Sequence, residues 1–214
     1  MLKSSLSNLK FLEILDEHRQ SFYGCPQEWY PGEWQRLCGC GPSAASTIIW
    51  YLGHFLPPFG IDFSAKSKKN CLSLMTEVWE YVTPTEQGIP ELKLFYEAVL
   101  AYAKSKGLRL EYNLCELPKD KSRRPEFFEV IDFLEQGLIQ DAPIAFLNLC
   151  NGKEKNLERW HWVTIASLEE PEDGRDHFVN ILDSGLIKSV NLSLWFETTK
   201  LGGGFVYFTS PGLA

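Results

Sequence analysis

The chain has 214 residues, of which 44% are apolar and 23% charged, and its formal net charge is −7. This composition is that of an ordinary globular protein, so it excludes a disordered chain, a collagen and a coiled coil. A negative net charge is also opposite in sign to that of proteins that bind nucleic acid or anionic membranes without specificity. We therefore expect no nucleic-acid partner and no membrane partner.

The N-terminal segment lacks the features of a secretory signal. Glu13, Asp16 and Glu17 interrupt the region where a signal peptide carries an unbroken apolar run. No stretch approaches the ~18–20 apolar residues that cross a bilayer. We therefore expect a cytoplasmic protein whose cysteines stay reduced. These cysteines are Cys25, Cys38, Cys40, Cys71, Cys115 and Cys150.

Helical patterns dominate the first two thirds of the chain. The apolar spacing predicts an amphipathic helix over residues 7–19 and an almost wholly apolar helix that begins near Gly41 and ends at His54. A helix without a polar face belongs in a core. Further helices are predicted over residues 72–82, 90–106 and 125–140, and a strand over residues 108–114.

Strand patterns dominate the last third. Strands are predicted over residues 142–149, 160–168, 177–183 and 205–209, with a short helix over 192–198 and a flexible glycine turn at 202–204. The acidic turn 169–174 joins the second and third strands into a hairpin. Helices followed by strands are the α+β pattern. We predict one domain over residues 1–214, with a helical part over about 1–140 and a sheet part over about 141–214.

The segment Gly39-Cys40-Gly41-Pro42 carries the strongest chemical signal. Pro42 fits the first turn of a helix, because its fixed φ angle suits a helix and its missing N–H group is not needed there. Cys40 would then lie at the N-terminal end of the apolar helix, where backbone N–H groups and the helix dipole favour an anion. A thiolate is such an anion, so this position is typical of an activated nucleophile.

A thiolate nucleophile needs a base, and the base needs a group that orients it. His161 begins a predicted strand, and the next strand of the same hairpin ends at Asp183. The hairpin can place both side chains on one sheet face, where the carboxylate binds one imidazole nitrogen while the other nitrogen faces the sulfur. His18 is expected at the surface, and His54 lies about 20 Å from Cys40 along the apolar helix.

Two windows of the sequence, over about residues 35–52 and 160–184, resemble the papain-like cysteine peptidases. The residues concerned are GCGPSAAS at 39–46, HWVTI at 161–165 and ILDS at 181–184. They are most similar to the branch that processes bacteriocin leader peptides and to its bacterial relatives. The resemblance implies Cys40 as nucleophile, His161 as base and Asp183 as orienting group. It also implies a cleft between a helical half and an antiparallel sheet.

The resemblance further implies a glutamine upstream of the cysteine, whose amide stabilises the oxyanion. In the best-known members this glutamine would fall on Trp34, one residue before Gln35. Relatives often carry it further upstream in an aromatic loop, which is the setting of Gln27. Both Gln27 and Gln35 are therefore candidates.

The reaction expected from these residues is attack by the Cys40 thiolate on the carbonyl carbon of a peptide or small acyl substrate, which gives a thioester. Water resolves the thioester in a peptidase, and an amine resolves it in an acyl- or peptidyl-transferase. The same residues serve both reactions. A non-catalytic binding protein that retains the fold is the alternative from another class.

Less specific interpretations of the same residues remain open. Cys40 fits an inert buried thiol, and Cys38 with Cys40 fits a redox pair or, with a histidine, a metal site. The sequence lacks C-x-x-C spacing and paired CxxC motifs, so we expect no metal and no cofactor. Residues 183–185 also fit a simple turn, and Asn180 is a second residue that could orient His161.

Overall fold

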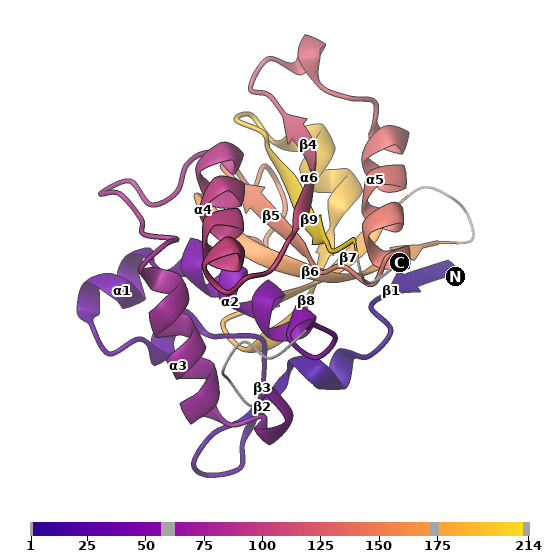
Figure 1. The fold of residues 1–214 in the computed structure, drawn as a ribbon. Helices are drawn as coiled ribbons and strands as arrows, with labels where there is room; N and C mark the ends of the chain where they lie inside the picture. The colour runs from indigo at the N-terminus through magenta and orange to yellow at the C-terminus, as the bar shows by residue number, and fades with distance from the viewer. Residues whose placement is uncertain (1, 57–62, 172–175, 212–214) are drawn as a thin grey trace.

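The computed structural model describes residues 2–56, 63–171 and 176–211. Its main feature is an antiparallel sheet with helices packed on both faces (Figure 1). Most helices come from the first two thirds of the chain and most strands of the sheet from the last third. The predicted α+β class is therefore confirmed.

The helices and strands match most of the predicted elements to within a few residues. The helices are α1 (Glu33–Cys38), α2 (Cys40–Leu52), α3 (Lys68–Trp79), α4 (Leu92–Ser105), α5 (Phe127–Ile139) and α6 (Leu192–Thr198). The strands are β1 (Leu2–Ser5), β2 (Glu13–Leu15), β3 (Ser21–Tyr23), β4 (Glu111–Leu117), β5 (Ile144–Asn148), β6 (His161–Glu170), β7 (Phe178–Asp183), β8 (Leu186–Asn191) and β9 (Gly203–Thr209).

The large sheet has the strand order β4–β9–β5–β6–β7–β8, and β1 pairs with β6. Strand β6 pairs along one edge with two strands: its first half pairs with β5 and its second half with β1. Strand β7 pairs with β6 along its other edge, so the predicted hairpin forms. Residues 172–175 of its connecting turn lie outside the described residues. Because β1 and β4 also join the sheet, the helical and sheet parts overlap along the chain; a single domain over residues 1–214 stays a prediction.

Helices cover both faces of the sheet because its central strands are apolar on both sides. In β5, Ala145 and Leu147 pack in the core formed with α2, α3 and α4. Ile144 and Phe146 alternate with them and pack in the core that includes α5 and α6. Helix α2 lies inside the molecule with residues 41–52 all buried, as its lack of a polar face predicts.

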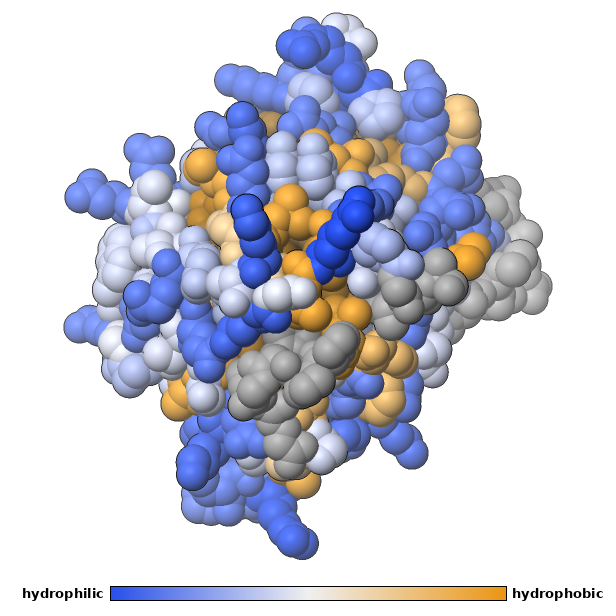
Figure 2. Space-filling model, in the orientation of Figure 1, coloured by the Kyte–Doolittle hydropathy of each residue, from blue (hydrophilic) through white to orange (hydrophobic). Residues whose placement is uncertain are grey.

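The outer surface is more hydrophilic than these two cores. Figure 2 shows hydrophilic side chains around the rim of this view, with hydrophobic ones reaching the surface near its centre. Among the described residues, the helices are all too short or too polar to cross a membrane.

The predicted helix over residues 7–19 is wrong. The segment forms a 3-10 turn, η1 (Leu9–Leu12), followed by β2, which pairs with β3 in a separate two-stranded sheet. Leu12 and Ile14 are fully buried, whereas Leu15 is 39% exposed. The apolar residues therefore follow the alternation of a strand. Arg19, between the two strands, has a φ of 64°, which a right-handed helix cannot accommodate.

The glycine run 202–204 is also different from the expected flexible turn, because Gly203 and Gly204 begin β9. Gly203 has a φ of 145°, and a Cβ atom there would overlap the backbone carbonyl oxygen of Leu147 on β5. The glycine thus allows two strands to approach each other closely.

We expect Gly203→Ala to lower the free energy of unfolding by about 3 kcal/mol or more, because the methyl group meets backbone that cannot move aside. The matched control is Gly107→Ala, where φ is 73° but a Cβ would meet nothing within 4 Å; there we expect a loss of only ~1 kcal/mol. Urea unfolding of both variants measures the difference. Equal losses would contradict the close approach of the two strands.

Candidate active site

Cys40 is the first residue of α2, as the Gly39-Cys40-Gly41-Pro42 motif predicts. Gly39 is the N-cap, and the first turn of the helix carries no acidic side chain. The N-terminal N–H groups and the positive end of the helix dipole are therefore not offset by a local carboxylate. Cys40 itself is partly exposed. Its thiol combines access from solvent with a position that favours negative charge.

Gly41 lets a neighbouring loop approach the start of α2. A Cβ atom at Gly41 would lie 2.8 Å from Cδ1 of Ile89, in the loop before α4. The indole N–H of Trp162 donates a hydrogen bond of 2.8 Å to the carbonyl oxygen of Ile89, and its ring stacks on Phe95. The loop is thereby fixed both to the cysteine helix and to β6. Trp162, next to His161 in the chain, acts in packing.

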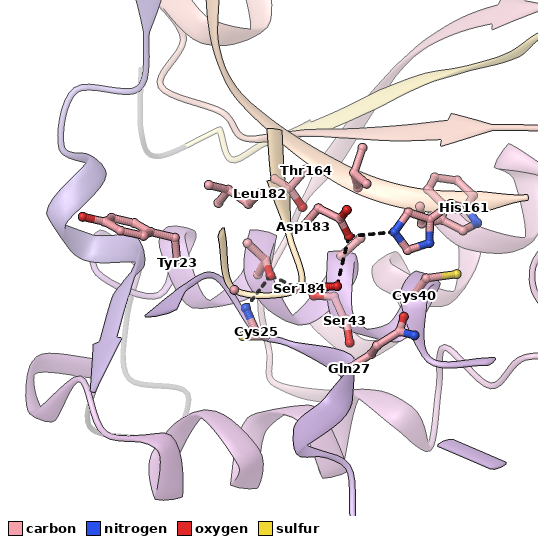
Figure 3. A pocket seen from close by; sticks show the side chains of 15 residues that line it. Tyr23, Cys25, Gln27, Cys40, Ser43, His161, Thr164, Leu182, Asp183 and Ser184 are labelled. Carbon is pink, nitrogen blue, oxygen red and sulfur yellow. Dashed lines mark hydrogen bonds and ion pairs between the residues drawn. The ribbon is translucent and has the colours of Figure 1, made fainter. Parts of the chain in front are cut away.

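His161 is the first residue of β6, and Asp183 is the last residue of β7. Nε2 of His161 lies 2.8 Å from Oδ1 of Asp183, with both side chains largely buried. Figure 3 shows the other ring nitrogen on the side of Cys40. All three residues line one small pocket. The structure therefore brings together the three residues that the sequence suggested.

Opposing effects act on the pKa of His161. Burial lowers this pKa, but hydrogen bonds to Asp183 and Cys40, together with the negative charges of these two side chains, raise it to about 10. The contact with Asp183 therefore favours the protonated form of the ring. An imidazolium ring beside a sulfur at a helix N-terminus stabilises the thiolate form of that sulfur.

Lys188 is a member of the site that sequence reasoning missed. Its Nζ lies 2.5 Å from Oδ2 of Asp183, and the hydroxyl of Ser184 lies 3.4 Å from Oδ1. Burial raises the pKa of Asp183, but the hydrogen bonds and charges of His161 and Lys188 lower it to about 2. The carboxylate therefore stays ionised, with one oxygen directed to each cation.

The turn between β7 and β8 explains how Lys188 reaches Asp183. Ser184 and Gly185 have φ angles of 51° and 76°, as in a two-residue hairpin turn with positive φ at both positions. Strand β8 returns directly along β7 with Lys188 opposite Ile181, so Lys188 and Asp183 are diagonal neighbours on one face. A Ser-Gly pair after an apolar strand is the sequence signal for this hairpin.

The two candidate glutamines occupy different places. Gln27, in the 3-10 turn η2 (Gln27–Trp29), lines the pocket that holds Cys40, and Figure 3 shows it beside this cysteine. Its amide nitrogen donates to the carbonyl oxygen of Arg36 over 2.9 Å. Gln35 lies in α1, where its side-chain oxygen accepts a hydrogen bond from the N–H of Gly32. The structure thus brings Gln27 to Cys40, whereas Gln35 caps its own helix.

The segment that carries Gln27 is held against two helices. The backbone N–H of Cys25 donates to the hydroxyl of Thr47 on α2 over 2.9 Å. The buried thiol of Cys71 on α3 lies 3.0 Å from the sulfur of Cys25. These contacts fix the chain two residues before Gln27, and the hydrogen bond to Arg36 holds the end of the Gln27 side chain.

The other residues weighed from the sequence lie away from this pocket. The ring of His54 stacks on Phe11 with ring centroids 4.2 Å apart, and His18 is exposed. The amide of Asn180 donates to Ser167 and Glu169. All six cysteines are free thiols. In the described part of the chain, no group of three or more His, Cys, Asp or Glu residues is arranged to hold a metal ion.

Comparison with solved structures gives a likeness to the crystal structure of UfSP from C. elegans, whose fold is papain-like, with a TM-score of 0.52 and 9% sequence identity. The fold is papain-like. The match covers 98% of this chain and 34% of that chain, so this chain spans about a third of its length. No protein-family model and no curated protein matches the sequence. The likeness concerns the fold alone and does not extend to the bacteriocin-leader branch.

The Asp183–Lys188 pair predicts a pH-dependent contribution to stability. The folded-state pKa of Asp183 is depressed, so the contribution is fully present above about pH 4 and is lost as the pH falls through about 2. We expect Lys188→Met to lower the free energy of unfolding by about 2 kcal/mol at pH 7, because a buried carboxylate loses one cation.

Urea unfolding of the wild type and of Lys188→Met at pH 7 and pH 3 tests this prediction. The difference between the two proteins should be smaller at pH 3. Lys119→Met, which removes an exposed lysine, should change stability by less than about 0.5 kcal/mol at either pH. A difference that grows on acidification would contradict the assigned pKa direction.

Proposed function

We propose that the protein is a cysteine peptidase or a related thiol acyl hydrolase in which Cys40, His161 and Asp183 form a catalytic triad. The observation that carries this proposal is the 2.8 Å contact between Nε2 of His161 and Oδ1 of Asp183, with the ring's other nitrogen on the side of Cys40. The papain-like fold supports it. The position of Cys40 at the start of α2 adds the helix dipole to the stabilisation of the thiolate.

The proposed reaction begins with the thiolate–imidazolium pair. The Cys40 sulfur attacks the carbonyl carbon of an amide, and the π electrons of the carbonyl move to its oxygen. As the tetrahedral intermediate collapses, His161 gives its proton to the leaving nitrogen, and a thioester remains. Neutral His161 then takes a proton from water, which attacks the thioester. The acid is released and the ion pair is restored, while Asp183 holds the ring in place.

Gln27 is the oxyanion donor that we favour over Gln35. Its amide carries two N–H groups, and the hydrogen bond to the Arg36 carbonyl uses one of them. That bond holds the amide still and leaves the second N–H available to a substrate oxygen beside Cys40. A preorganised donor of this kind stabilises the negative charge that develops in the transition state.

We expect Gln27→Ala to lower the rate constant for acylation by p-nitrophenyl acetate by about 10²-fold, because one oxyanion donor is lost. The matched control Gln35→Ala should stay within about twofold of wild type, since its side chain binds the backbone of its own helix. Stopped-flow acylation rates measure both. A larger loss in Gln35→Ala than in Gln27→Ala would reverse the assignment.

Two alternative functions, a transferase and a non-catalytic binding protein, differ from the hydrolase in the fate or the absence of the thioester. Resolution by an amine would make the protein an acyl- or peptidyl-transferase, and a binding protein would form no thioester. The ordered His161–Asp183 pair favours chemistry over binding alone, because it raises the pKa of His161 in the way that a thiolate partner requires. Leader-peptide processing is the finer proposal; it rests on the sequence motifs.

The triad predicts selective reactivity of Cys40 toward iodoacetamide. At pH 6 a free thiol is almost fully protonated, so rapid alkylation of Cys40 needs the imidazolium partner. We expect His161→Gln to slow alkylation of Cys40 at least about tenfold at pH 6. Peptide mass spectrometry gives the rate at each cysteine separately.

Cys150 is the internal control for this experiment. It is partly exposed, and backbone N–H groups of Lys200 and Gly152 lower its pKa independently of the triad. Its alkylation rate should be the same in the wild type and in His161→Gln. The proposal fails if Cys40 is alkylated no faster than Cys115 in the wild type, or if the His161 substitution leaves the Cys40 rate unchanged.

A further inference from the structure

Cys40 borders a second hollow besides the pocket that holds His161 and Asp183. We call it the Trp160 groove; its volume is about 510 Å³, within the range of sites that bind small molecules. It is lined by Leu37, Cys38, Cys40, Glu86, Gln87, Gly88 and Trp160. Three separate segments contribute: the α1–α2 junction, the loop before α4 and the start of β6. The proposed nucleophile therefore lies between the catalytic pocket and this groove.

Two large apolar side chains of the groove are exposed to solvent. Leu37 is 70% exposed and Trp160 is 56% exposed. A single exposed apolar residue is ordinary, but here two of them from different elements border one concave surface next to a proposed nucleophile. An apolar group that enters the groove would cover both and remove them from water.

Trp160 also has an unusual backbone conformation. Its φ is 54°, in the left-handed region that bulky residues rarely occupy. Burial of the indole does not explain why this conformation is kept, because the residue as a whole is 56% exposed. Strained residues cluster at functional sites, where the conformation itself serves the function. Trp160 directly precedes His161, so the strain lies beside the proposed base.

The opposite segment of the groove is preformed. Thr85 and Gly88 exchange two backbone hydrogen bonds of 3.0 and 2.9 Å, and the Thr85 hydroxyl donates a third to the Gly88 carbonyl. A Cβ atom at Gly88 would meet nothing within 4 Å, so the space beside it is open. Glu86 supplies the charge of the lining. Apart from the proposed thiolate of Cys40, the groove thus offers apolar contact and one negative charge.

We propose that the Trp160 groove selects the substrate by binding a large apolar side chain next to the scissile bond, between Trp160 and Leu37. This inference rests on the proposed function, since it is the reaction at Cys40 that brings the substrate to the groove. Glu86 disfavours an acidic group at the same position through like-charge repulsion. The substrate class is therefore an acyl or peptide compound with an aromatic or long aliphatic residue at that position.

Chloroacetamides with different N-substituents test the proposal without a known substrate. The Cys40 thiolate attacks the chloromethyl carbon, a C–S bond forms and chloride leaves, so the substituent comes to lie near the reacting sulfur. We compare N-methyl, N-benzyl and N-carboxymethyl probes by peptide mass spectrometry. Each rate at Cys40 is divided by the rate of the same probe with N-acetylcysteine. We expect the corrected N-benzyl rate to exceed the N-methyl rate about tenfold, and the N-carboxymethyl rate to fall below both.

Matched variants locate the origin of the preference. Trp160→Ala and Leu37→Ala should each reduce the ratio of N-benzyl to N-methyl rates at least about threefold. Phe128→Ala is the control, because Phe128 is similarly exposed, at 64%, but lies on α5; its ratio should equal that of the wild type. If Trp160→Ala slows every probe because it disturbs His161, Leu37→Ala decides, since Leu37 lies on α1.

The two proposals fail in distinguishable ways. A ratio of N-benzyl to N-methyl rates near one in the wild type overturns the proposed selection by the groove, and so does an unchanged ratio in Leu37→Ala. In either case a fast N-methyl rate at Cys40 still supports the triad. A ratio that falls equally in Phe128→Ala also overturns it. Labelling of Cys40 no faster than labelling of Cys115 by every probe overturns the proposed function itself.

Discussion

The site depends on one buried carboxylate held between two cations. Asp183 is 4% exposed in its side chain, with Nε2 of His161 on one oxygen and Nζ of Lys188 on the other. A carboxylate removed from water without such partners would be strongly unfavourable. With both partners present it remains charged and fixed, and it determines which nitrogen of the ring is directed to Cys40. The register of β6, β7 and β8 therefore sets the orientation of the proposed base.

The nucleophile comes from the other side of the fold. Helix α2 is buried along almost its whole length, so its position relative to the sheet is fixed by core packing. Only its first residue, Cys40, approaches the surface. The Gly41–Ile89 contact and the Trp162–Ile89 hydrogen bond connect the start of this helix to β6. The sulfur and the ring are thus placed by rigid elements, which is what a preorganised site requires.

Much of this arrangement was predictable from local sequence signals, and the remainder depends on contacts between distant segments. The Gly-Pro start of α2 and the apolar strands that carry His161 and Asp183 are strong local patterns. The apolar residues of 7–19 satisfied a helical spacing, but burial of Leu12 and Ile14 against the core selected a strand instead. Lys188 is one of many lysines in the sequence, and only the two-residue turn of β7–β8 brings it to Asp183.

Position 160 links the proposed chemistry to the proposed selection. The left-handed φ of Trp160 turns the chain immediately before β6 begins, so two consecutive residues are divided between two hollows: Trp160 lines the groove and His161 the catalytic pocket. Cys40 borders both. A substrate side chain that binds Trp160 would therefore be held one residue away from the proposed base, and binding energy gained in the groove would orient the reacting carbonyl at the sulfur. The backbone conformation of Trp160 therefore affects both the proposed selection of the substrate and the proposed catalysis.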